Sequence, residues 1–102
     1  MGRYRGHRGR RDPEHAHIRD GLRSVGALVI DVADLAKFVD LVVIWRGAVW
    51  FVEVKSARGE LKPDQEVLRD QIVAAGGRWA CWRCLDEALG EVMGCRDDEP
   101  KH

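Results

Sequence analysis

The sequence predicts an α/β fold, in which helices flank a mixed central sheet and the elements follow the order α-β-β-β-α-β-α. Two segments with helical spacing of apolar residues each begin at a Pro and stop at a Gly, at about 13–25 and 63–75. Between them, two apolar runs joined by Arg46-Gly47 have the pattern of a β-hairpin. Further apolar runs at 27–32 and 78–84 are expected to supply the other two strands.

Length and composition indicate one small domain. The chain has 102 residues, a net charge of zero and 45% hydrophobic residues, which suffice for a single modest core. No apolar run approaches the about 20 residues of a membrane span, and no apolar signal-peptide core follows the basic N-terminus. We therefore expect a cytoplasmic protein with a flexible arm at 1–11, one domain at 12–93 and a disordered tail at 94–102.

The N-terminal arm is rich in Arg and Gly. Arg10 and Arg11 lie next to the domain and are candidates for contact with nucleic-acid phosphates, which a flexible basic arm favours. A disordered, solubilising terminus explains the same composition equally well, so both interpretations stay open.

The first helix is expected to begin at Asp12-Pro13, as N-cap and first helical residue, and to stop at Gly26. Glu14 lies four residues before Ile18 and would continue the apolar face. A carboxylate on the inward face of a first turn favours a role in a site over a simple interaction with the helix dipole. The inward stripe consists of Ile18, Leu22 and Val25.

The hairpin strands at 39–45 and 48–55 are apolar on both faces, which predicts a central sheet covered on both sides. With Arg46-Gly47 as the turn, counting outward sets Asp40 opposite Glu53, and Lys55 points to the same side. Directly opposed residues have Cβ atoms roughly 4.5–5.5 Å apart, so the two carboxylates would repel without a cation. A divalent metal between them would remove this conflict.

The second half of the chain adds a third polar group to this end of the sheet. A polar loop at 56–62 leads to the helix at 63–75, whose first turn carries Gln65 on the inward face. A strand at 78–84 and a short helix at 86–93 complete the domain. Asp40, Glu53, Gln65 and Glu14 thus come from separate elements and are expected to converge. The inward stripe of the second long helix is Leu68, Ile72 and Ala75.

The cysteines and histidines are not expected to form a site. Cys81 and Cys84 have C-x-x-C spacing, but in a strand residues three apart point to opposite faces, which indicates buried free thiols. His15 and His17 are two apart on a helix and do not face each other. The histidines without an assigned role are His7, His15, His17 and His102.

Residues 38–89 resemble the PD-(D/E)XK nuclease superfamily, and more narrowly its VRR-NUC type. One departure is Val39, where the family usually has Pro; this position shapes the start of the strand and carries no chemistry. The matching motifs read Val39-Asp40-Leu41, Glu53-Val54-Lys55-Ser56, Ala57-Arg58-Gly59 and Pro63-Asp64-Gln65.

The resemblance implies a restriction-endonuclease-like α-β-β-β-α-β core and a role for each matching residue. Asp40, Glu53 and the Val54 backbone carbonyl would bind Mg²⁺ or Mn²⁺, and Glu14 would reach the metal through water. The catalytic residues would be Asp40, Glu53, Lys55 and Gln65, with Lys55 assisting the attacking water and Gln65 positioning it or Lys55. The expected DNA contacts are Arg58, Lys62, Arg10 and Arg11.

By resemblance, the expected function is metal-dependent cleavage of structured DNA by a Holliday junction resolvase-like endonuclease. Such domains are often encoded by bacteria or phages and act as homodimers, in which a two-fold axis presents two sites to a branched substrate. The alternative is a non-catalytic nucleic-acid-binding module of a replication or repair complex, which would need only the basic residues, with Arg69 among them. The presence of every motif acid and the lysine favours the nuclease. The small size counts against a sequence-specific restriction enzyme.

Overall fold

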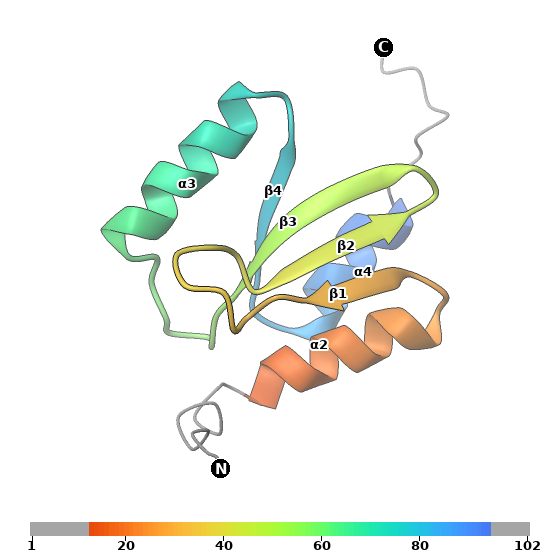
Figure 1. Cartoon of the computed structure of the whole chain (residues 1–102). Coiled ribbons are helices and arrows are strands. Elements are labelled where there is room, and N and C mark those ends of the chain that lie inside the picture. The colour runs from red at the N-terminus through yellow and green to blue at the C-terminus, as the bar shows by residue number, and fades with distance from the viewer. Residues whose placement is uncertain (1–12, 95–102) are drawn as a thin grey trace.

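The computed structural model describes residues 13–94, and its helices and strands follow the predicted order (Figure 1). The fold class is therefore confirmed. The predicted arm at 1–11, with Arg10 and Arg11, and residues 95–102 of the predicted tail lie outside the described residues. The elements are α2 (Pro13–Ser24), β1 (Leu28–Asp31), β2 (Leu41–Trp45), β3 (Ala48–Val54), α3 (Pro63–Ala74), β4 (Arg78–Trp82) and α4 (Leu85–Gly94). Along 13–94 no helix is both long and apolar enough to cross a membrane.

The four strands form one mixed sheet in the order β1-β2-β3-β4. β1 pairs with β2 and β2 with β3 in antiparallel fashion, whereas β4 is parallel to β3. The parallel pairing is possible because α3 returns the chain to the end of the sheet at which β3 begins. The predicted hairpin register is confirmed from Trp45↔Ala48 to Leu41↔Val52. Arg46 and Gly47 both have positive φ, 51° and 85°, as a type I′ hairpin turn requires.

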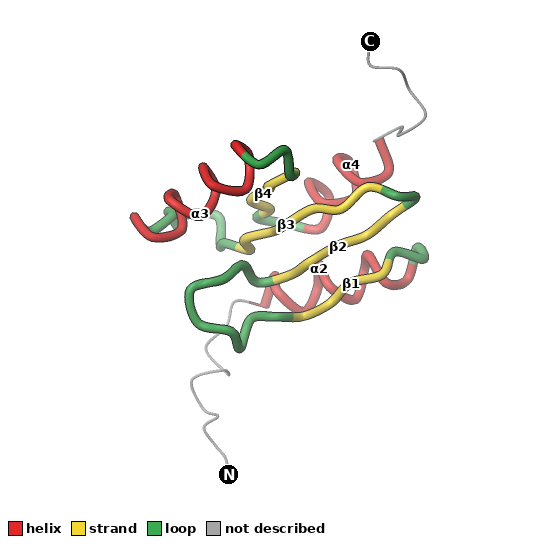
Figure 2. Tube along the Cα trace, turned by 45° about the horizontal axis from the view of Figure 1, so that its top comes forward, coloured by secondary structure: helices red, strands yellow, loops and turns green. Residues whose placement is uncertain are grey.

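Helices α2 and α4 pack together against one face of the sheet, and α3 lies apart from this pair, beside β4 (Figure 2). Helices thus flank both faces of the sheet, as predicted. Among residues 13–94, the cover on the α3 side does not extend over β1, whose Leu28 and Ile30 are 55% and 45% exposed. The covered face carries the core, which includes Ile18, Leu22, Leu41, Val43, Trp50, Val52, Trp82, Ala88 and Val92.

Two tryptophans fix α4 to the sheet. Trp50 and Trp82 are 1% and 2% exposed, and their indole Nε1 atoms donate hydrogen bonds to the two carboxylate oxygens of Glu91 at 3.1 and 2.9 Å. A buried indole N–H needs an acceptor, and one carboxylate supplies two.

Helix α2 buries a different face of its first turn from the one predicted. The buried stripe is His15, Ile18 and Leu22, whereas Glu14 is half-buried and Val25 is exposed. His15, for which no site role was predicted, has a structural contact. Its Nε2 lies 3.0 Å from Asp31 Oδ2, and Arg19 Nη1 donates to the same oxygen at 3.0 Å.

Burial of Asp31 opposes its ionisation, but hydrogen bonds from His15, the Ala33 backbone and Arg19 outweigh it and lower the pKa of Asp31 to about 2. The Ala33 N–H bond measures 3.2 Å. These contacts tie the first turn of α2 to the end of β1.

Candidate active site

Asp40 lies directly before β2, at the end of the hairpin that is remote from its turn. The ladder of paired residues stops at Leu41 and Val52, one position short of the predicted pair of Asp40 and Glu53. The Asp40 N–H donates to the Val52 carbonyl at 2.9 Å, so Asp40 and Leu41 both lie against Val52, in the manner of a β-bulge. Asp40 Oδ2 in turn accepts the Val54 N–H at 2.8 Å, which holds the carboxylate against β3.

Glu53 is completely buried, at 0% exposure, on the α3 face of β3. Its Oε1 accepts a hydrogen bond from Gln65 Nε2 at 3.2 Å, while its Oε2 has no partner among the described residues. Burial, and then the negative charge of Asp40, raise the pKa of Glu53 to about 8, although the positive charge of Lys55 acts in the opposite direction. Glu53 is therefore a carboxylate whose ionised form lacks a sufficient cation.

Gln65 joins α3 to this carboxylate. Its Oε1 accepts the Lys62 N–H at 2.8 Å, which satisfies a backbone donor at the helix start, and its Nε2 points to Glu53. The amide oxygen thus accepts from the backbone while the amide nitrogen donates to the carboxylate, and these two bonds fix the orientation of the Gln65 side chain. The structure places Gln65 against Glu53, and its predicted role in positioning Lys55 or the attacking water stays a prediction.

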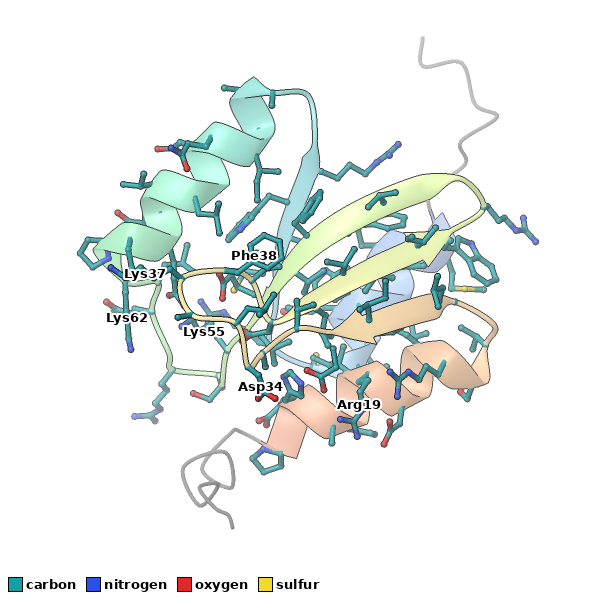
Figure 3. All side chains as sticks on the ribbon, viewed as in Figure 1. Arg19, Asp34, Lys37, Phe38, Lys55 and Lys62 are labelled. Carbon is teal, nitrogen blue, oxygen red and sulfur yellow. The ribbon has the colours of Figure 1, made fainter. Side chains whose placement is uncertain are left out.

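A cavity of about 200 Å³ opens beside Glu53. Figure 3 shows Lys37, Lys55 and Lys62 at this end of the molecule, where loop 32–40 faces the start of α3. Lys55 is half-buried, and its backbone N–H donates to the Trp82 carbonyl at 3.1 Å. Lys37 and Phe38 were not recognised as site residues in the sequence. The cavity is lined by Lys37, Phe38, Glu53, Lys62, Asp64, Gln65 and Leu68.

The loop that follows Lys55 is held by Arg83, a third residue that was not recognised in the sequence. Arg83 Nη1 donates to the Ser56 carbonyl at 2.7 Å and to the Gly59 carbonyl at 2.6 Å. The exposed Arg58 lies inside the loop thus closed. In the sequence, Arg83 stood out only as part of the C-x-x-C segment.

Glu14 lies at the start of α2, and its contact with a metal through water stays a prediction. Within 13–94 no three His, Cys, Asp or Glu side chains gather as a metal-binding group. Cys81 pairs with Glu53 in the parallel register, and burial raises the pKa of its thiol. The prediction of buried thiols is wrong, because Cys81 is half-buried and Cys84 is exposed.

α3 has no buried residue, and Ala75 of its predicted inward stripe is exposed.

The residues at this end fit a hard divalent cation. Two adjacent carboxylates, one with an unpartnered buried oxygen, provide negative charge that nearby lysine only partly offsets. Mg²⁺ and Mn²⁺ prefer oxygen ligands, and Mg²⁺ typically takes one or two carboxylates and completes its shell with water and phosphate. Asp40, Glu53 and a backbone carbonyl satisfy this requirement without a third acidic side chain.

No protein-family model matches the sequence, and no curated protein matches it either. A solved structure described as a VRR_NUC domain is similar to this chain with a TM-score of 0.65 and 25% sequence identity. The match covers 81% of this chain and 92% of that chain. It confirms the resemblance read from the sequence: the chain has a VRR-NUC fold, which supports a nuclease-type domain.

Proposed function

We propose that the protein is an endonuclease that uses Mg²⁺ or Mn²⁺ to hydrolyse phosphodiester bonds in structured DNA, in the manner of a Holliday junction resolvase. The observation that carries this proposal is Glu53. It is fully buried, has one oxygen without a partner, stands beside Asp40 and lines a cavity with lysines at its rim. A buried carboxylate of this kind is unfavourable for folding alone and is typical of a site that binds a cation.

Each residue of the site has a distinct task in this proposal. Asp40, Glu53 and the Val54 carbonyl would hold the metal, with Glu14 acting through water. The metal would supply positive charge for the phosphate oxygens and lower the pKa of the attacking water. Gln65 keeps Oε1 of Glu53 engaged and leaves Oε2 available.

Lys55 is the residue expected to act on the reacting groups. Its ammonium group lies near enough to Glu53 to influence the pKa of that carboxylate. From there it orients the water that attacks phosphorus in line and stabilises the negative charge that develops on the phosphate. The leaving group is the 3′ oxygen of the sugar. Arg58 and Lys62, together with Arg10 and Arg11 of the arm, would contact neighbouring phosphates.

A homodimer suits a branched substrate, since a two-fold axis places two sites against opposing strands. Leu28 and Ile30 of β1, which are exposed among residues 13–94, offer apolar area for a second copy. The alternative function is DNA binding without cleavage, as an accessory module. This alternative would need only basic residues for phosphate contact, such as Arg58, Lys62 and Arg69.

The deciding experiment measures cleavage of labelled four-way junction, flap and linear duplex DNA with Mg²⁺, with Mn²⁺ or with EDTA. Asp40→Asn keeps an acceptor for the Val54 N–H and removes the charge, and Asp20→Asn is the matched control because Asp20 is 62% exposed and lies on α2. We expect junction cleavage that requires metal, is lost in Asp40→Asn and persists in Asp20→Asn. Binding without cleavage, unchanged by Asp40→Asn, would instead support the accessory module.

A further inference from the structure

The loop between β1 and β2 holds one lysine in an unusual backbone conformation. Lys37 has a φ of 60°, in the left-handed region that residues other than Gly, Asn and Asp seldom adopt. Both sides of the loop are fixed: the Leu35 N–H donates to the Val32 carbonyl at 2.9 Å, and the Phe38 ring packs edge-on against Phe51 at 6.2 Å. Strained residues held by their surroundings occur preferentially at functional sites.

Lys37 reaches the same cavity as Lys62, although the two lysines come from different elements. Both line it, Lys37 from the loop and Lys62 from the position that begins α3 (Figure 3). Both side chains are exposed, and neither forms an ion pair with a described carboxylate, although Asp64 also lines the cavity. Two exposed ammonium groups at one opening, outside any ion pair of the described residues, provide a binding site for an anion.

The nature of the anion follows from the position of the opening. Glu53 lies in the wall of this cavity, so a phosphodiester approaching Glu53 brings its neighbouring phosphates to the rim. The N-terminus of the 12-residue helix α3 is part of the same wall, and Asp64 and Glu66 in its first turn offset the dipole there, so the positive charge at the opening comes from the two lysines. A nucleic-acid backbone, with a charge at every nucleotide, matches both lysines at once.

We propose that Lys37 is a substrate-binding residue, which together with Lys62 binds a DNA phosphate next to the scissile one. The strand to be cut then passes between loop 32–40 and the start of α3. This inference rests on the proposed function for the identity of the polymer, and it adds to that function the path of the strand and a residue that no family motif contains.

The test uses Lys37→Asn, because Asn tolerates a positive φ and the change removes the ammonium group without added backbone strain. Arg46→Asn is a matched control, because Arg46 is also an exposed cation with a positive φ, of 51°. It lies at the turn end of the hairpin, so this variant loses the same charge at the same kind of backbone position, away from the cavity. Circular dichroism melts establish that both variants are folded, and Lys37→Gly provides a second variant that also relieves the strain.

The readout is the dissociation constant for four-way junction DNA, measured in EDTA over a series of salt concentrations, followed by kcat and KM for cleavage in Mg²⁺. For Lys37→Asn we expect roughly 5-fold weaker binding and a salt slope reduced by about one, as loss of one phosphate contact predicts. The KM rises with little change in kcat, Lys37→Arg restores binding, and Arg46→Asn behaves like wild type.

An unchanged dissociation constant and salt slope in Lys37→Asn would overturn the inference, and so would an equal effect of Arg46→Asn. The two proposals fail separately. If the wild type binds and never cleaves, but Lys37→Asn weakens binding, the phosphate contact is supported and the nuclease proposal is contradicted. If the wild type cleaves DNA and Lys37→Asn binds and cleaves normally, the nuclease proposal is supported and the inference about Lys37 is contradicted.

Discussion

Gln65 Nε2 lies 3.2 Å from Glu53 Oε1, and this hydrogen bond connects the start of α3 to the end of β3. Because the same amide accepts the Lys62 N–H, the position of the buried carboxylate and the first turn of α3 depend on one side chain. Helix α3 buries no residue of its own, so the link is a large part of what positions it.

Replacement of Gln65 by Ala is expected to reduce both stability and cleavage. The change leaves the Lys62 N–H without its acceptor and Glu53 without its donor, which together correspond to a loss of about 1–3 kcal/mol in the free energy of unfolding. Urea denaturation measures this loss, and the Mg²⁺ concentration at half-maximal cleavage should rise. Gln71→Ala, on an exposed position of the same helix, should change neither quantity.

Glu53→Gln is expected to stabilise the metal-free protein at alkaline pH. The pKa of Glu53 is raised from 4.5 to about 8 in the folded state, by burial first and then by Asp40, with Asp64 adding to the effect and Lys55 opposing it. The native state therefore binds a proton that the unfolded state has lost, and wild-type stability falls as pH rises from about 4.5 to about 8.

Thermal melts in EDTA at pH 4 and pH 8.5 check this prediction. The two proteins should melt alike at pH 4, and at pH 8.5 the midpoint of Glu53→Gln should be higher by at least about 5 °C. Mg²⁺ should raise the midpoint of the wild type and leave Glu53→Gln unaffected. A lower midpoint for the variant at pH 8.5 would contradict the assigned cause of the pKa shift.

Asp31→Asn is expected to lower stability at neutral pH. The pKa of Asp31 is depressed to about 2, so its contribution is present above the unfolded pKa of about 3.8 and is lost as pH falls through 2. We expect the melting midpoint to drop by a few degrees at pH 7, with the difference shrinking towards pH 2. Asp20→Asn removes a neighbouring, mainly exposed acid and serves as control.

Arg83→Lys is expected to release the loop after Lys55 while preserving the charge. A lysine cannot reproduce the two short bonds from Nη1 to the Ser56 and Gly59 carbonyls. The bond after Arg58 should become sensitive to limited digestion by trypsin, and cleavage of DNA should fall about 10-fold through loss of order around Lys55. Resistance to trypsin equal to that of the wild type would show that Arg83 does not hold the loop.

Much of the fold could be predicted because its signals are local. The hairpin register followed from a two-residue turn, and Pro63 and Gly76 marked the limits of α3. Glu14 and His15 were harder to separate, because either residue continues a stripe through Ile18 at a spacing of three or four. Docking against Asp31, sixteen residues further along, decides in favour of His15.

The remaining site residues depend on contacts that spacing does not reveal. Arg83 meets the loop at Ser56 and Gly59 only because β4 lies parallel to β3, and no neighbouring residue indicates this contact. The positive φ of Lys37 is likewise imposed by its loop, since Lys has no intrinsic preference for that conformation. Asp40, Glu53 and Lys55 were accessible from the sequence because a short hairpin brings them together.

The β-bulge at Asp40 bears on how the hairpin closes during folding. The ladder begins at the Arg46-Gly47 turn, where each added pair is apolar, and the two carboxylates meet only after the pair of Leu41 and Val52 has formed. Growth from a turn proceeds on the microsecond scale and encounters charge repulsion only at its final step. The apo protein should therefore fray first at this end, and hydrogen exchange of the Val54 amide should slow when Mg²⁺ is added.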